Sequence, residues 1–265
     1  MRLRIQSHLH YTTENPCAIL LQIEAAHDPH QIILSSSISL NEGKIIAGQD
    51  GVGTRRWVQS DTTFICDYTA DVQVDRPVIP FQSLTRAPLH QLPSDATSYL
   101  MASRYCQPEP FFDFVGQQFS NLMGGAKIAA MSTWITDNFT YDIAASNAQT
   151  TAADTFAQKA GVCRDYAHVL IAMARASVIP ARFVSCYAPG VSPQDFHAVA
   201  EVYLDGSWHI VDPTGMADPW STVRIGVGHD AADVAFMTSF GWMDLVNQKV
   251  QVTKIETAGI AALPL

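Results

Sequence analysis

The chain has 265 residues, of which 48% are hydrophobic and 15% are charged. This length and composition predict a globular protein with a substantial core, in one large domain or two ordinary ones, and exclude a disordered chain. The formal net charge of −9 argues against a nucleic acid as partner.

The N-terminus carries the basic residues Arg2 and Arg4, but no apolar stretch of the length that a signal peptide needs. The longest apolar stretch in the body of the chain, around residues 169–174, is far too short to span a bilayer. We therefore expect a cytoplasmic protein with no membrane partner. The five cysteines include no Cys-x-x-Cys pair, so we expect no disulfide framework.

Residues 1–80 predict a β-rich domain. Short apolar runs such as 18–23 alternate with turn signals at residues 41–43 and 49–51. Strands this short, without helical periodicity, are typical of a small antiparallel β-sandwich. A segment with several prolines follows, and we interpret its residues 81–93 as a linker.

Residues 94–265 predict helices first and strands afterwards. A helical stretch is expected over 111–138, with an interruption near Gly124-Gly125, and a strongly apolar helix follows Cys163. Antiparallel strands are then expected over three short segments, 181–187, 197–204 and 208–212. Helices followed by an antiparallel sheet make this second domain an α+β domain.

Cys163 stands where a glycine-containing turn enters the apolar helix. A thiol there lies at the positive end of the helix dipole, and the free backbone N–H groups favour its thiolate and could stabilise an oxyanion. The alternative is a buried cysteine beneath a helix start, and position alone favours that alternative. For the remaining cysteines we expect burial as small hydrophobes: Cys17, Cys66, Cys106 and Cys186.

A predicted hairpin brings a histidine and a carboxylate together. A two-residue turn at Asp205-Gly206 sets Asp212 opposite Val199. His197 shares a face with Val199, because side chains alternate with period two along a strand. His197 and Asp212 then become diagonal neighbours, roughly 7–8 Å apart at the backbone. The spacing permits a carboxylate to orient an imidazole, whereas a three-residue loop would break this parity.

These residues suggest a catalytic triad of Cys163, His197 and Asp212. His197 would hold Cys163 as an ion pair and later protonate the leaving group, while Asp212 would fix the tautomer of His197. Glu201 shares the face of His197 and is a substitute carboxylate, although a solvated or helix-capping role fits it better. Gln158 is a weak candidate for an oxyanion donor.

A zinc site is the other chemistry that these residue types could support, from Cys163, His168, His197 and His209. His168 lies about 140° around the helix from Cys163, and His209 falls on the opposite face of the hairpin from Asp212. No standard ligand spacing is present. We therefore expect no metal and no cofactor, and we interpret His168 as a packed core histidine.

Three blocks of sequence resemble the transglutaminase-like superfamily of bacterial proteins: Gly161-Val162-Cys163-Arg164-Asp165-Tyr166-Ala167-His168, Asp195-Phe196-His197-Ala198 and Asp212-Pro213-Thr214. Residues 99–105 and 224–235 are similar to the same family, and residues 1–80 resemble the β-rich region often joined to it. The resemblance implies a papain-like α+β core whose Cys-His-Asp triad falls on Cys163, His197 and Asp212.

The resemblance also implies amide chemistry through a thioester. The favoured function is a cysteine hydrolase, a peptidase or deamidase, that acts on peptide or isopeptide amides of a protein substrate. A true transglutaminase, which transfers a glutaminyl acyl group to an amine, is one alternative, and a non-catalytic binding module that retains the fold is another. Two departures, Val199 where relatives commonly have tryptophan and Cys186 where glycine is frequent, leave the substrate open. A homo-oligomer formed through a sheet edge of the first domain also stays open.

Overall fold

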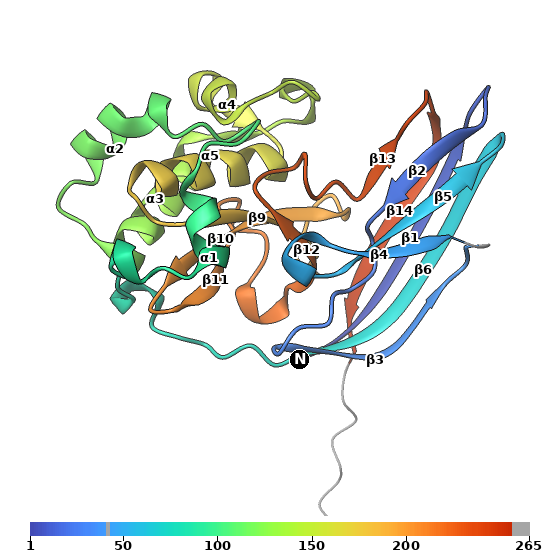
Figure 1. Ribbon diagram of the computed structural model, residues 1–265, viewed down its shortest axis with the longest axis horizontal. Coiled ribbons are helices and arrows are strands. Elements are labelled where there is room, and N and C mark those ends of the chain that lie inside the picture. The colour runs from blue at the N-terminus through green and yellow to red at the C-terminus, as the bar shows by residue number, and fades with distance from the viewer. Residues whose placement is uncertain (41–42, 256–265) are drawn as a thin grey trace, which may run out of the picture.

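Two antiparallel sheets form one half of the molecule (Figure 1). The structure is a computed structural model that describes residues 1–40 and 43–255. Within them, one sheet has the order β14 (Asp244–Lys254), β1 (Arg2–Thr12), β6 (Thr63–Val74) and β3 (Gln31–Ile38). The other has the order β13 (Met237–Ser239), β2 (Cys17–Leu21), β5 (Thr54–Ser60) and β4 (Lys44–Ala47).

Alternation along the strands explains why these sheets pack into a sandwich. In β1, Leu3, Ile5 and Leu9 are fully buried in the core between the sheets. Arg4, Gln6 and His8 alternate with the buried positions and face outward, and the Nε of Arg4 lies 2.8 Å from Asp71 of β6. Each fully buried Leu or Ile contributes about 1.5–3 kcal/mol relative to an exposed one. The predicted β-sandwich is confirmed.

The strand pairing differs from the predicted domain limits in one respect. Residues 237–254, which the sequence assigned to the second domain, lie in the sheets of the sandwich. Strand β14 pairs with β1 over almost its whole length, and Val250 and Val252 enter the sandwich core. The segment follows the helical half in the chain, so its order in the sequence alone assigned it to the second domain.

Helices and a third antiparallel sheet form the other half (Figure 1). The helices are α1 (Ser94–Thr97), α2 (Phe112–Gln118), α3 (Gly124–Asn138), α4 (Ala152–Gln158) and α5 (Cys163–Ala176). The sheet has the order β11 (Ser207–Val211), β10 (His197–Leu204), β9 (Ala181–Tyr187) and β12 (Val223–Gly228). Two short strands, β7 (Thr140–Tyr141) and β8 (Ala160–Gly161), pair in parallel. The predicted α+β class is confirmed.

The glycine pair at the start of α3 lets the linker lie against this helix. The helical stretch is broken before Gly124, which adopts a φ of 52°. A Cβ atom on Gly125 would lie 1.8 Å from the carbonyl oxygen of Phe81, and the N–H of Gly125 donates to Leu84 at 2.8 Å. Any side chain at Gly125 would therefore push the linker away from α3.

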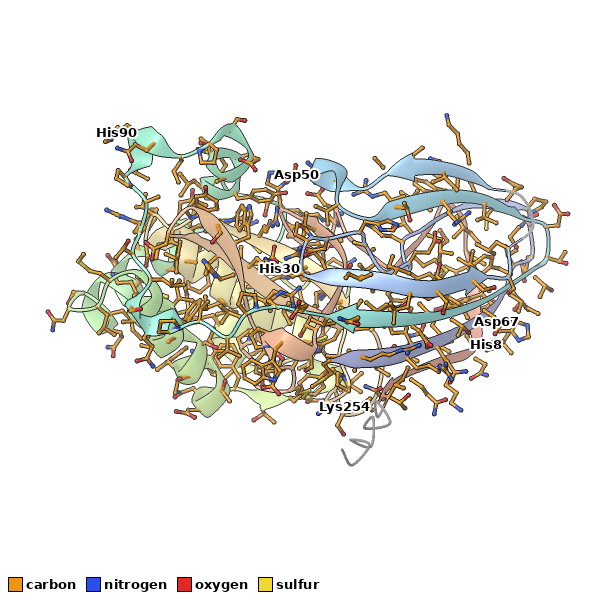
Figure 2. All side chains as sticks on the ribbon, turned by 90° about the horizontal axis from the view of Figure 1, so that it is seen from below. His8, His30, Asp50, Asp67, His90 and Lys254 are labelled. Atoms are coloured by element: carbon orange, nitrogen blue, oxygen red, sulfur yellow. The ribbon has the colours of Figure 1, made fainter. Side chains whose placement is uncertain are left out.

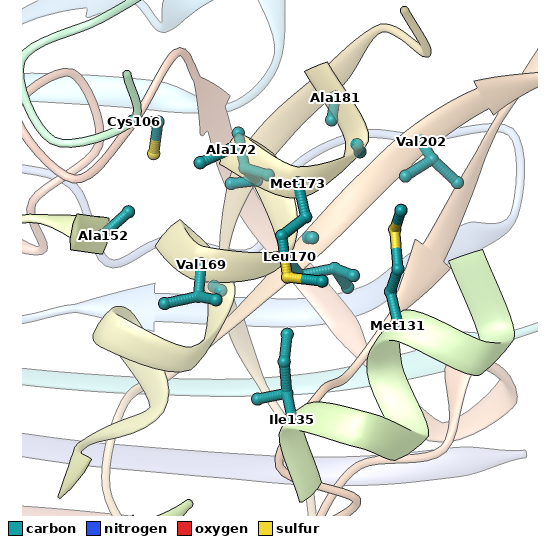
Figure 3. Packing of buried hydrophobic residues seen from close by; sticks show 14 of the residues in the cluster. Cys106, Met131, Ile135, Ala152, Val169, Leu170, Ala172, Met173, Ala181 and Val202 are labelled. Carbon is teal, nitrogen blue, oxygen red and sulfur yellow. The ribbon is translucent and has the colours of Figure 1, made fainter. Parts of the chain in front are cut away.

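Helix α5 forms the centre of the second core. Its residues 165–175 are all buried, so the helix is surrounded by protein on every side. Leu170 and Met173 of α5 pack in one cluster with Met131 of α3 and Val202 of β10 (Figure 3). The helix that begins at Cys163 is thus fixed in position by the α+β core.

The predicted hairpin register is present. Asp205 and Gly206 have φ values of 45° and 78°, as a two-residue turn of this type requires. Ala200 lies opposite Val211, and the same register continued by one residue sets Val199 opposite Asp212.

The two halves share an interface with buried polar contacts. Tyr187 of β9 enters the sandwich core, and its hydroxyl donates to the carbonyl of Ile23 at 2.7 Å. Gln31 of β3 donates to the carbonyl of Arg224 in β12 at 2.9 Å. Within the described residues, none of the helices has both the length and the apolar character needed to cross a bilayer.

Candidate active site

Cys163 is the first residue of α5. The turn before it is held by Asp165, whose fully buried carboxylate accepts from the N–H of Val162 at 2.9 Å and pairs with Arg164, also at 2.9 Å. The N–H groups of Cys163 and Arg164 donate to no backbone carbonyl of the described chain. Cys163 is partly exposed, whereas the other four cysteines are buried, as predicted.

Asp212 follows β11 directly and binds His197. The Nε2 atom of His197 donates to Oδ2 of Asp212 at 2.9 Å, and the two side chains are 0% and 1% exposed. Asp212 also accepts from the N–H and hydroxyl of Thr214, at 2.9 and 2.8 Å, and from the N–H of Ala217 at 2.8 Å. Burial alone would raise the pKa of Asp212, but His197 and Thr214 outweigh it and hold the pKa below its usual value.

The environment of His197 favours the imidazolium. Burial alone would lower its pKa, but the hydrogen bonds with Asp212 and Cys163 and their charges raise the pKa of His197 to about 10. The second ring nitrogen, Nδ1, is buried and makes no regular hydrogen bond within the described residues. Because Nε2 is occupied by Asp212, Nδ1 is the atom available to the thiol of Cys163.

Cys163 and His197 both line a cavity of about 540 Å³. Much of its wall is apolar, with Phe183, Phe196 and Phe236 among the lining residues. This is a suitable environment for an apolar side chain beside the thiol. The charged residues of the wall are Arg104, Arg164 and Asp195.

Tyr141 is a residue of the site that the sequence did not predict. Strand β7 pairs with β8 so that Tyr141 lies opposite Gly161, two residues before the thiol. Burial raises the pKa of the Tyr141 phenol, and Cys163 raises it further, while a hydrogen bond from the Cys163 backbone acts in the opposite direction. The hydroxyl of Tyr141 therefore lies against the thiol of Cys163 and accepts from its N–H.

His168 lies in the core and not in the cavity wall. It is fully buried, its ring stacks on Tyr105 at 5.1 Å, and its Nε2 accepts from the N–H of Ala231 at 3.2 Å. Burial lowers the pKa of His168 to about 3, so the ring is neutral at physiological pH. His168 is a packed core histidine, in agreement with the sequence interpretation.

Glu201 is neither solvated nor a helix cap, contrary to expectation. Its carboxylate is fully buried and pairs with Arg182 at 2.7 Å and with Arg224 at closer range. Arg224 lies on β12 and also pairs with Asp28 of the sandwich half. Glu201 is committed to a buried ion network between β9, β10 and β12. It is not a substitute for Asp212.

Gln158 and His209 also have other partners. The amide of Gln158 donates to the carbonyls of Ala145 and Ala160, both at 2.9 Å, and Gln158 does not line the cavity. The Nε2 atom of His209 lies 3.0 Å from the carbonyl of Leu204. Across residues 1–40 and 43–255, there is no group of three or more His, Cys, Asp or Glu side chains that could hold a metal ion.

One family model and one solved structure match this chain well. A family model of the transglutaminase-like superfamily matches residues 115–213, a segment that contains Cys163, His197 and Asp212. The crystal structure of a proposed cysteine protease from Cytophaga hutchinsonii is 32% identical, covers 97% of this chain and 91% of that one, and superposes with a TM-score of 0.91.

Two further matches are weaker. An uncharacterized protein from Mycobacterium leprae is 28% identical over 117 residues, and this match covers 41% of this chain and 42% of that protein, so it spans less than half of either. The periplasmic domain of TgpA from Pseudomonas aeruginosa is 18% identical and covers 80% of this chain and 77% of that one, with a TM-score of 0.40. That likeness is too distant to indicate a function.

Proposed function

The chain belongs to the transglutaminase-like superfamily, and on this premise we propose that it is a cysteine hydrolase that cleaves peptide or isopeptide amides through a thioester. The observation that carries the proposal is the buried contact of 2.9 Å between His197 and Asp212. This contact keeps an imidazolium beside Cys163 at a helix start. A thiolate–imidazolium pair is the resting state that an acyl-transfer cysteine enzyme needs.

In the first step, the thiolate of Cys163 attacks the carbonyl carbon of the amide, and the carbonyl oxygen becomes an oxyanion. The N–H groups of Cys163 and Arg164, which donate to no backbone carbonyl within the described residues, stabilise this oxyanion. We assign the hydroxyl of Tyr141 as a further donor because it lies against the same N–H. The imidazolium of His197 then protonates the leaving amine, the C–N bond breaks and a thioester remains on Cys163.

In the second step, neutral His197 takes a proton from water, and the resulting hydroxide attacks the thioester. The C–S bond breaks, the acid is released and the proton on His197 restores the ion pair with the Cys163 thiolate. Asp212 keeps Nε2 occupied throughout, so that Nδ1 is the nitrogen that exchanges protons with the substrate. If an amine takes the place of water, the same sequence yields a new amide, which is the transglutaminase reaction.

Alkylation by iodoacetamide across pH, followed by mass spectrometry of the five cysteines, tests the ion pair. We expect Cys163 to be alkylated selectively below pH 7 and this selectivity to disappear in His197→Ala. Cys163→Ala controls for labelling elsewhere. Uniform, slow labelling of all five cysteines would contradict a catalytic role and leave a binding module that retains the fold.

Incubation with a peptide library, with and without an added primary amine, separates the two acceptors. Hydrolysis predicts products that gain the mass of water, whether or not the amine is present. Products that carry the amine and form at the expense of hydrolysis would identify a transglutaminase. Both sets of products should be lost in Cys163→Ala.

We also propose a cytoplasmic location, which the five free cysteines support, since free thiols persist in a reducing compartment. The expected partner is a peptide or protein substrate. Three further points stay predictions: that the protein has no nucleic-acid or membrane partner, that it needs no cofactor, and that it associates with itself through a sheet edge.

A further inference from the structure

A second cavity, of about 500 Å³, lies along the outer edge of β11, and we call it the β11 groove. One wall is formed by residues 207–212 of β11 and its end. The other is formed by residues 76–79 and 81, which belong to the segment 75–93 between β6 and α1 that we call the linker from here on, together with three residues of α3. His30, Ala217, Pro219 and Trp220 complete the lining. It shares no lining residue with the cavity of Cys163 and His197. Asp212 lines the β11 groove, so the groove lies behind the proposed triad.

Strand β11 is the last strand of its sheet, and its outer backbone groups are unpaired (Figure 1). The two-residue turn makes Leu204 and Ser207 a hydrogen-bonded pair, so the next pair, Tyr203 and Trp208, is not hydrogen-bonded. The N–H and C=O of Trp208, and those of Ile210 two residues on, therefore point away from β10. Within the described residues, these four groups make no hydrogen bond.

The linker borders this edge without pairing to it. Pro77 and Pro80 have no N–H to donate, so this part of the linker cannot form a regular ladder with β11. The linker backbone bonds to the hairpin near the tip, where the N–H of Asp205 donates to the carbonyl of Thr85 at 3.0 Å, and the ring of Phe81 packs edge-on against His209. Figure 2 shows the linker leaving β6 and running past His30 toward the helical half. The edge of β11 is thus set in a groove and left open.

The β11 groove contains an arginine, Arg76, that has no ion-pair partner within 4.0 Å among the described residues. Nη1 of Arg76 donates to the carbonyls of Pro219 and Thr222, while its Nη2 is buried without a partner in the described structure. Asp212 is the only acidic residue of the lining, and its charge is already matched by His197.

We propose that the β11 groove binds an extended peptide segment of a partner protein, which adds as a strand to β11 and carries an acidic group near Arg76. An open strand edge recognises peptides through main-chain hydrogen bonds, and the walls of the groove select side chains. The segment bonds to the four free groups of Trp208 and Ile210. Its acidic group supplies the negative charge that Arg76 lacks. This binding site does not depend on the proposed reaction.

Selection from a displayed library of random octapeptides, with Cys163→Ala as bait to prevent cleavage, tests the proposal. We expect enriched peptides to carry an acidic residue at one end. On binding of the synthetic peptides, hydrogen exchange should slow at the amides of Trp208 and Ile210. Two variants of the bait serve as controls: Arg76→Gln should weaken binding at least tenfold, and Thr133→Trp should block the groove from the α3 side.

Several outcomes would overturn the proposal. Enriched peptides that leave the exchange of the Trp208 and Ile210 amides unchanged would show that they bind elsewhere, as would full binding to Thr133→Trp. If the groove bound free glutamate as tightly as a whole peptide, it would be a site for a small anion and not a site for strand addition. A library that yields no binder would also refute it. Loss of hydrolysis in Cys163→Ala with peptide binding intact is, by contrast, the expected result, and it separates this site from the catalytic proposal.

Discussion

Replacement of Asp212 by asparagine should change the protonation of His197 more than any other substitution outside the imidazole itself. The carboxylate contacts Nε2 at 2.9 Å in a site where both side chains are almost fully buried. Two unit charges about 4 Å apart in a protein environment interact by about 4 kcal/mol. At about 1.4 kcal/mol per factor of ten, the loss of this charge lowers the proton affinity of His197 roughly a thousandfold.

In the intact protein, the pKa of His197 is raised to about 10, and burial is the largest influence that opposes the charged form. In Asp212→Asn, a neutral amide replaces the carboxylate and no longer offsets the effect of burial. The pKa of His197 should therefore fall to near or below neutral pH. NMR of protein labelled with ¹³C at histidine Cε1 measures this titration directly, and His197→Gln identifies the signal among the nine histidines. Asp205→Asn, an exposed carboxylate of the same hairpin, is the matched control.

The same interaction predicts how stability depends on pH. The folded-state pKa of His197 lies above the usual value of 6.5, so its stabilisation is fully present below pH 6.5 and is lost as the pH rises through about 10. The free energy of unfolding of the intact protein, measured by urea titration, should fall across this window by up to about 1.4 kcal/mol per pH unit, and that of Asp212→Asn should fall less. If both proteins have the same slope and the same His197 titration, the assigned role of Asp212 is wrong.

Other substitutions probe the remaining parts of the site. Tyr141→Phe removes only a hydroxyl, and we expect kcat to fall about 10²–10³-fold, as for an oxyanion donor, with alkylation of Cys163 at neutral pH retained. An unchanged kcat would exclude that role. Glu201→Gln leaves Arg182 and Arg224 buried without the negative charge of Glu201. The free energy of unfolding, measured by thermal unfolding, should therefore fall by about 3–5 kcal/mol. A loss below 1 kcal/mol would mean that the ion network is dispensable.

The parts of the site that depend on local sequence were predictable. The two-residue turn at Asp205-Gly206 fixes the register of its hairpin, and period-two alternation then brings His197 and Asp212 to one face. Cys163 at a helix start is equally local, because a glycine-containing turn before an apolar run specifies it. In each case, the decisive residues are close together in the chain; His197 and Asp212, the most distant pair, are 15 positions apart.

What depends on distant pairing was not predictable. Tyr141 reaches Cys163 because two-residue strands pair in parallel, and strands this short leave no periodicity to detect. The sequence correctly placed Glu201 on the same strand face as His197. The arginines that pair with Glu201 come from β9 and β12, and no local sequence pattern predicts this pairing. For the same reason, the sequence did not predict that β14 pairs with β1.

The pairing of β1 with β14 has a consequence for synthesis on the ribosome. Leu3 lies opposite Lys254, so these two strands meet only after about 250 intervening residues have been made. Until then, one side of β1 remains an unprotected edge, and such edges promote association between chains. The α+β half is complete earlier, apart from its contacts with the sandwich. A nascent chain therefore has a folded α+β half while its sandwich still lacks a strand, and this interval is when we expect chaperones to bind.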